Sequence, residues 1–187
     1  MSYCGWASAS EIDRIYHDIE WGIPVYDDRK QFEYLMMEVM QCGLSWELML
    51  RKRQTFQKCF DNFEYDKVAA YDDKDVERIM NTENMIRSER KIRAVINNAR
   101  CFSEYLWAYS GGKTIIYPSH GRGEVPASND LSEKISKDLK NEGFKYLGAI
   151  TVYSHLQACG IINDHDIGCP CYKKIVDNFP TVTIANG

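Results

Sequence analysis

Apolar residues recur at helical spacing along most of this chain. Two stripes come first: Phe32, Leu35, Met36, Val39 and Met40, then Leu48, Met49, Phe56 and Phe60. Asp27 and Asp28 precede the first stripe and Ser45 precedes the second, and such residues cap helix N-termini. The pattern predicts two amphipathic helices, the first ending before Gly43.

The same periodicity continues through the rest of the sequence. Asp66 and Asp73 each precede a short apolar stretch, and Ser88 precedes a longer one that reaches Leu106 before Gly111. Later stripes contain Leu131, Ile135 and Leu139, and then Ile150, Tyr153 and Leu156. Each predicts a helix, with Asn129 or Asp130 as the cap of the penultimate one.

Between these stripes, residues 109–129 are rich in glycine and proline and predict a loop. No convincing run of residues alternates between apolar and polar, as strands require. The expected fold is an all-α bundle in one unit spanning 1–187, with the two chain ends meeting and a loose tail after about residue 172.

Composition narrows the class of protein only partly. Hydrophobic residues make up 44% and charged residues 27%, which is typical of a soluble globular protein, and no apolar run is long enough to span a membrane. The net charge of −4 argues mildly against a nucleic-acid partner. Three basic clusters weaken that argument, although a solvated helix face is the better explanation of any one of them. The clusters are Arg51, Lys52 and Arg53; Arg87, Arg90, Lys91 and Arg93; and Lys134, Lys137, Lys140 and Lys145.

The seven cysteines are an odd number and are scattered, and the N-terminus has no secretion signal. We therefore expect a reducing cytoplasm, where metal binding is a natural use of cysteine. His165 and Cys169 are four residues apart and can reach one ion, and Cys4 and His17 could complete a Cys2His2 site. The alternative is that these thiols are small core residues, and Cys42 and Cys171 leave the choice of ligands open.

Aromatic residues and one carboxylate are concentrated in the first quarter of the chain: Trp6, Tyr16, Trp21, Glu38 and Trp46. Glu38 lies beside an apolar stripe, where a carboxylate is costly without a partner. Aromatic faces with an acceptor fit a pocket for a flipped purine. The alternative is an aromatic core with Glu38 exposed to solvent.

A tight turn between two helices spans 143–148. Glycines there leave backbone amides free at the start of the next helix, where phosphate can bind, with Lys145 near the tip. The alternative is an ordinary connection between helices.

Taken in order, six segments resemble the bacterial 3-methyladenine DNA glycosylase I family and span residues 4 to about 172. They are Cys4-Gly5-Trp6; Tyr16-His17-Asp18 with Glu20-Trp21-Gly22; Glu38 with Gly43-Leu44-Ser45-Trp46; Ile86-Arg87 with Lys91-Ile92; Gly143-Phe144-Lys145-Tyr146-Leu147-Gly148; and Asn163-Asp164-His165 with Gly168-Cys169.

The resemblance implies a helix-hairpin-helix glycosylase that excises 3-methyladenine from double-stranded DNA as a cytoplasmic monomer. It implies one structural zinc ion held by Cys4, His17, His165 and Cys169. It implies a base pocket formed by Glu38, Tyr16, Trp46, Trp6 and Trp21, the first three taking part in catalysis. DNA contacts are expected from Gly43, Leu44 and Ser45, and from Gly143, Lys145 and Gly148.

Some positions depart from the family pattern. Asp13 occupies a position where the family often has tyrosine, Ser88 replaces a frequent histidine or asparagine, and residues 107–129 diverge. Asp164 is a candidate catalytic carboxylate or a partner of a zinc ligand, and no lysine is suited to form a Schiff base. Two other functions fit these features: a zinc-containing DNA-binding module without catalysis, and a glycosylase for another alkylated base.

Overall fold

The computed structural model describes residues 4–102, 106–120 and 125–184, and these residues are mainly helical. The α-helices in this part of the chain are α1 (Glu11–Ile19), α2 (Asp28–Gln41), α3 (Trp46–Cys59), α4 (Tyr65–Ala69), α5 (Asp73–Met80), α6 (Glu89–Cys101), α7 (Asp130–Asn141), α8 (Ala149–Ala158) and α9 (Pro170–Asn178). Short 3-10 helices are η1 (Gly5–Ser8), η2 (Asp61–Phe63) and η3 (Leu106–Ser110).

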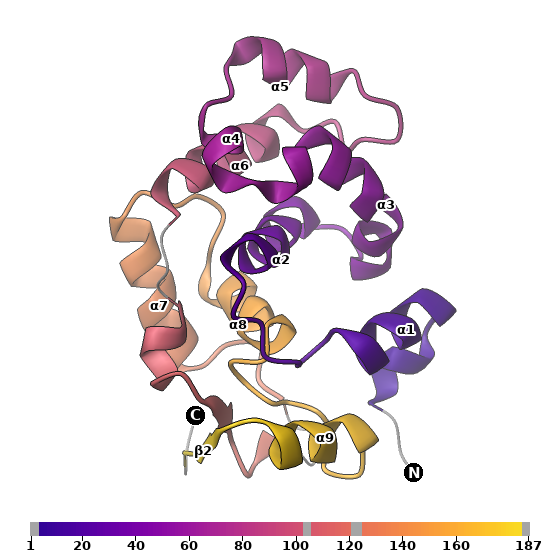
Figure 1. The fold of residues 1–187 in the computed structure, drawn as a ribbon, viewed down its shortest axis with the longest axis vertical. Helices are drawn as coiled ribbons and strands as arrows, with labels where there is room; N and C mark the ends of the chain where they lie inside the picture. The colour runs from indigo at the N-terminus through magenta and orange to yellow at the C-terminus, as the bar shows by residue number, and fades with distance from the viewer. Residues whose placement is uncertain (1–3, 103–105, 121–124, 185–187) are drawn as a thin grey trace.

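Helix α2 lies at the centre of the molecule, with α3 to α6 towards one end and α1, α7 and α9 towards the other (Figure 1). Every residue from position 31 to position 40 of α2 is buried. A helix that is buried on all sides must satisfy any charge it carries. Its two internal carboxylates, on Glu33 and Glu38, are therefore expected to have a binding partner in the protein or in a ligand.

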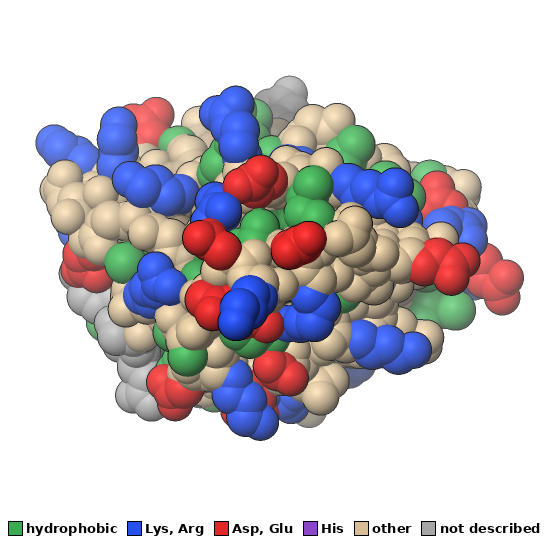
Figure 2. Space-filling view, turned by 90° about the horizontal axis from the view of Figure 1, so that it is seen from above, with side chains coloured by type: hydrophobic (Ala, Val, Ile, Leu, Met, Phe, Trp, Pro, Cys, Tyr) green, Lys and Arg blue, Asp and Glu red, His purple; other side chains and the backbone are tan. Residues whose placement is uncertain are grey.

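The end of the molecule that carries α5 has no surface patch of a single charge sign. Figure 2 shows this face, on which Lys and Arg side chains alternate with Asp and Glu. A polyanion gains little from such a surface because attraction and repulsion nearly cancel. This face is thus not favoured for contact with nucleic acid.

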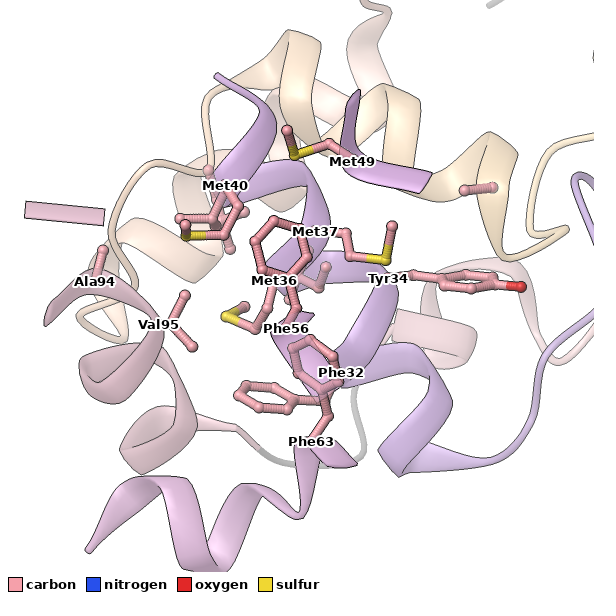
Figure 3. Packing of buried hydrophobic residues seen from close by; sticks show 14 of the residues in the cluster. Phe32, Tyr34, Met36, Met37, Met40, Met49, Phe56, Phe63, Ala94 and Val95 are labelled. Atoms are coloured by element: carbon pink, nitrogen blue, oxygen red, sulfur yellow. The ribbon is translucent and has the colours of Figure 1, made fainter. Parts of the chain in front are cut away.

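One continuous hydrophobic cluster fills the space around α2. Phe32, Met36 and Met40 project towards α3 and α6, where they meet Met49, Phe56 and Val95 (Figure 3). These side chains belong to the stripes that the sequence predicts, so the amphipathic periodicity correctly identifies the core. Asp27, Ser45 and Asn129 are confirmed as N-caps, each accepting a backbone N–H bond.

The expectation of a fold without strands is wrong in one place. Strands β1 (Thr114–Ile116) and β2 (Thr181–Thr183) pair in parallel, with Ile115 opposite Val182. Ile115 also donates to the carbonyl of Ile161 and accepts from the N–H of Asn163. Three-residue strands are too short to show alternation, so they are invisible to periodicity.

The expected loose tail is also wrong for residues 172–184, which form most of α9 and all of β2. Pro170 occupies the first turn of α9 and Ile175 anchors the helix in the core. Other helix boundaries shift by a few residues. The long helix predicted from Ser88 ends at Cys101 rather than Leu106, and the caps of α4 and α5 are Glu64 and Asp72.

The loop expected over 109–129 contains β1, while its Gly121 and Gly123 lie outside the described residues. Two helices, α1 and α9, were not singled out by periodicity. Among the described residues no helix is both long and apolar enough to cross a membrane.

Candidate functional site

A cavity of about 530 Å³ opens between η1, α1, α2, α3 and α8. All five residues predicted for the base pocket line it: Trp6, Tyr16, Trp21, Glu38 and Trp46. They come from separate elements, so the fold assembles the pocket from positions up to forty residues apart. The cavity volume is within the range that holds a small planar ligand.

The aromatic rings of this pocket contact one another. The Tyr16 ring lies 5.5 Å from Trp46 and 6.4 Å from Trp6, and the rings of Trp6 and Trp21 are 5.0 Å apart at 75°. Edge and tilted contacts at these distances stabilise aromatic groups while leaving ring faces open. Trp6 and Trp46 are only partly buried, which leaves aromatic surface for a ligand.

Three polar groups of the pocket have no hydrogen-bond partner within the described part of the chain. The Tyr16 hydroxyl and the Trp46 Nε1 are buried and unpaired. The Glu38 carboxylate, 5% exposed, makes no side-chain hydrogen bond. Buried polar groups are nearly always paired, so three unpaired groups around one cavity indicate a ligand that pairs with them.

Burial raises the pKa of Glu38 to about 8. Removing the carboxylate from water destabilises its charged form, and no cation compensates. Burial also raises the pKa of Tyr16 well above its ordinary value, so its hydroxyl stays neutral and can donate. A positively charged ligand next to Glu38 would favour the ionised carboxylate.

The sequence leaves the roles of Asp13 and Asp164 open. Asp13 is buried, accepts a bond from the Ser10 hydroxyl at 2.8 Å within the first turn of α1, and does not line the cavity. Asp164 does line the cavity, but its carboxylate is engaged by Tyr153 at 2.6 Å, Gln157 at 2.8 Å and His120 at 2.9 Å. A carboxylate so occupied supports the pocket wall rather than holding a free lone pair for catalysis.

The four residues expected to bind metal converge near the C-terminal end of α1. Cys4, His17, His165 and Cys169 are all buried, and one ligand atom from each lies within 4.8 Å of every other. The Cys169 thiol is 3.5 Å from His17 Nε2, and the Cys4 thiol is 3.7 Å from His165 Nδ1. Residues from both ends of the sequence therefore share one cluster.

Hydrogen bonds fix the proton on each imidazole. His17 Nδ1 faces Asp18 Oδ1 at 2.9 Å, and His165 Nε2 faces the carbonyl oxygen of Trp21 at 3.1 Å. Both partners are acceptors, so these two nitrogens carry the protons. The remaining nitrogens, His17 Nε2 and His165 Nδ1, then face each other with lone pairs at 3.1 Å.

Two opposed lone pairs beside two thiols form a donor set that could hold one metal ion. Tetrahedral zinc with bonds of about 2.0 to 2.3 Å has ligand atoms about 3.3 to 3.8 Å apart. Four of the six distances among the cluster's nitrogen and sulfur atoms run from 3.1 to 3.9 Å, and all six are within 4.8 Å. The Cys2His2 donor set and its outer hydrogen bonds fit a metal ion.

The two spare thiols considered in the sequence are excluded from this cluster. Cys171 approaches His17 from the Nδ1 side, 4.0 Å away, which is the side already bonded to Asp18. Cys42 lies after α2, where its thiol contacts the carbonyl of Glu38. Asp18, which accepts from His17 Nδ1, was not predicted as part of this site. Its position next to His17 in the sequence indicates that such a contact is possible.

The two segments expected to contact DNA are both exposed connections between helices. The turn at 43–45 joins α2 to α3, with Gly43 at φ +81° and Leu44 37% exposed. The hairpin at 143–148 joins α7 to α8, with Gly143 at φ +94°. Cys42 Sγ lies 4.0 Å from Thr151 Oγ1 in the first turn of α8, so the two connections are neighbours.

The first basic cluster is largely used within the protein. Arg53 is only 14% exposed and binds Glu20 and Glu33, while Arg51 pairs with Glu47. Lys52 donates to the carbonyl of Asn84. Arg53 thus joins α1, α2 and α3 and does not present its charge to a nucleic acid. The Lys91 ammonium is likewise turned inward, whereas Lys145 remains exposed.

An aromatic cleft with an unpaired carboxylate and two unpaired donors is suited to a planar nitrogen heterocycle. The chain belongs to the methyladenine glycosylase family, whose model matches residues 6–172. It is 40% identical over 182 residues to DNA-3-methyladenine glycosylase 1 of Escherichia coli strain K12, covering 92% of this chain and 97% of that protein.

Solved structures agree with this assignment. A crystal structure of 3-methyladenine DNA glycosylase I is 38% identical, with a TM-score of 0.85, and the match covers 91% of this chain and 99% of that one. A variant of 3-methyladenine DNA glycosylase I in complex with 3-methyladenine is 33% identical, with a TM-score of 0.83, over 91% of this chain and 97% of that one.

Proposed function

We propose that this protein excises 3-methyladenine from alkylated DNA by hydrolysing the N-glycosidic bond. The observation that carries the proposal is the set of unpaired polar groups, Glu38, Tyr16 and Trp46, around one aromatic cavity. A methylated adenine supplies both a donor for the carboxylate and a ring for the aromatic faces. Family membership and the relatives' substrate support the same activity.

The reaction needs little help with the leaving group because 3-methyladenine in DNA is already cationic. As the bond between C1′ and the base nitrogen breaks, its electron pair moves to the base, which leaves neutral. The sugar becomes oxocarbenium-like, and water attacks C1′ and loses a proton to solvent. The enzyme's task is to flip the nucleotide, select the base and stabilise positive charge.

Each pocket residue has a distinct part in this proposal. The Glu38 carboxylate accepts from the exocyclic amine, and Tyr16 donates or accepts one hydrogen bond. Trp46 and Trp6 stack on the electron-poor ring, and Trp21 closes the wall behind Trp6. No lysine is among the described residues that line the cavity, in keeping with hydrolysis and no Schiff base.

We propose zinc as the ion of the Cys4, His17, His165 and Cys169 cluster, with one ion per chain. Two thiolates and two imidazoles form a closed tetrahedral set with no open position for water, which is typical of structural zinc. Its effect is to join the N-terminal segment and α1 to the segment before α9. The chain from 1 to 187 then acts as one unit.

The duplex is proposed to contact the turn at 43–45 and the hairpin at 143–148. Leu44 inserts at the lesion, while the hairpin amides and Lys145 hold backbone phosphate in the manner of a helix-hairpin-helix protein. The partner is double-stranded DNA bound by a monomer. Because bacterial chromosomal DNA is cytoplasmic, we place the enzyme there.

The test is to identify the base released from methylated duplex DNA by chromatography. The proposal predicts free 3-methyladenine and intact strands with an abasic site. Release of a different base instead would favour a glycosylase of other specificity. Duplex binding with no release would favour a DNA-binding module.

A further inference from the structure

Helix α6 contacts both of the connections that face DNA in the proposed function. Near its start, Lys91 Nζ donates to the carbonyl oxygens of Met40 at 2.8 Å and Cys42 at 2.7 Å. These carbonyls belong to the C-terminal end of α2, which has no intrahelical donors for them. The ammonium thus fixes the backbone just before Gly43.

Near its end, α6 holds the hairpin. The fully buried Asn98 donates from Nδ2 to the carbonyl of Lys145 at 3.0 Å and accepts from the N–H of Lys145 at 2.7 Å. Asn97 Nδ2 donates to the carbonyl of Gly143 at 2.8 Å. The next residue, Tyr146, has φ +63°, a conformation that non-glycine residues rarely adopt without such support.

Lys91 and Asn98 are seven residues apart, which is two helical turns or about 10.5 Å along α6. A rigid helix therefore connects the turn to the hairpin. The charge on Lys91 is engaged by two carbonyls, and burial lowers the pKa of its ammonium. Such a lysine is poorly placed to act as a phosphate contact.

We propose that Lys91 and Asn98 are positioning residues that set the spacing between the turn at 43–45 and the hairpin at 143–148. The proposal rests on the proposed function only in that these two segments bind the duplex. With the spacing held, Leu44 can enter the stack while the hairpin grips the backbone. Loss of the spacing misplaces the lesion without changing the number of phosphate contacts.

The test compares Lys91→Met with Lys145→Met, the same substitution at an inward and an outward lysine. The probe is a duplex with an abasic-site analogue, so binding is measured without any excision step. Lys91→Met is expected to weaken binding about tenfold and to leave the salt dependence unchanged. Lys145→Met is expected to reduce the slope of log K against log salt by about one.

Binding of free 3-methyladenine separates positioning from a general loss of structure. Lys91→Met is expected to bind it within about twofold of wild type, because the pocket's unpaired polar groups are untouched. Asn98→Asp, which keeps the acceptor for Lys145 N–H and loses the donor, is expected to weaken duplex binding in the same way. If Lys91→Met does not fold, Asn98→Asp is the variant in which duplex binding is measured.

A salt slope reduced in Lys91→Met would overturn the proposal, because Lys91 would then be a phosphate contact. Wild-type duplex affinity in both Lys91→Met and Asn98→Asp would overturn it as well. Failure of the proposed function is distinct, since it would appear as absence of base release by the wild-type protein.

Discussion

The Nε2 atom of His165 lies 3.1 Å from the carbonyl oxygen of Trp21, and this contact joins the Cys/His cluster to the wall of the aromatic cavity. The ring of Trp21 also packs against His165 at 4.6 Å, and Trp6 packs edge-on against His17 at 5.4 Å. The Cys/His cluster and the aromatic cavity therefore share a boundary, although no cluster residue except Cys4 lines the cavity.

Loss of the metal cluster is expected to lower stability. Purified protein should contain about one zinc per chain. Cys4→Ala should lose the ion and unfold at a temperature lower by about 5 °C or more, because an unfilled cluster leaves opposed lone pairs buried. Cys171→Ala is the matched control, since its thiol lies outside the cluster. Zinc retained in Cys4→Ala, or lost in Cys171→Ala, would show that the ligand set is different.

The pH dependence of excision should follow Glu38. With its pKa raised to about 8 by burial, the carboxyl group is mostly protonated below that pH and loses the charge that strengthens its bond to the base amine. We expect kcat/KM to rise about tenfold per pH unit up to about 8 and then level off. Glu38→Gln should give a lower and flat profile. A wild-type profile that is flat between pH 6 and 8 would contradict this assignment.

The same carboxylate should reduce the stability of the protein. Between about pH 4.5 and 8 the folded state retains a proton on Glu38 that the unfolded chain releases, so the free energy of unfolding falls as pH rises through this window. Glu38→Gln should match wild type near pH 4.5 and be more stable at pH 8, by on the order of 4 kcal/mol. Denaturant unfolding at the two pH values measures this, and an equal difference at both would count against a buried, unpaired Glu38.

Trp46 should contribute to base binding by stacking. Trp46→Ala is expected to weaken binding of free 3-methyladenine about tenfold or more, the scale of one lost base-aromatic stack. Trp46→Phe keeps an aromatic ring and removes the unpaired Nε1, so its affinity for the base should lie between those of wild type and Trp46→Ala. Isothermal titration gives the three values. Equal affinities would place the base elsewhere in the cavity.

Much of this site could be predicted from sequence because its residue types are costly to bury without a purpose. Glu38 next to an apolar stripe, and paired cysteine and histidine at the two chain ends, indicate a pocket and a metal site. The group that each charged side chain binds is harder to predict. Arg53 and Lys91 have the same sequence appearance as phosphate-binding residues, but they bind Glu33 and the carbonyl of Cys42.

Some of the elements that were missed are stabilised by long-range contacts. Strand β2 exists because it pairs with β1, and α9 is held by Ile175 in the core. A three-residue strand is too short to show a local pattern, whereas α1 and α9 are amphipathic, so for these two helices the sequence did carry a usable signal. The bonds from Asn98 to Lys145 span 47 positions and, like β2, were invisible to periodicity.

In the proposed function, Glu38 selects the base to be excised. Methylated duplex DNA contains both 3-methyladenine and 3-methylguanine, and only the adenine has an exocyclic amine where Glu38 can accept. The direct measurement is the ratio of the two free bases released from one DNA preparation by wild type and by Glu38→Gln. Wild type is expected to release 3-methyladenine nearly exclusively, and both the rate and the ratio are expected to fall in the variant. Comparable release of both bases by wild type, or an unchanged ratio and rate in Glu38→Gln, would contradict this role of Glu38.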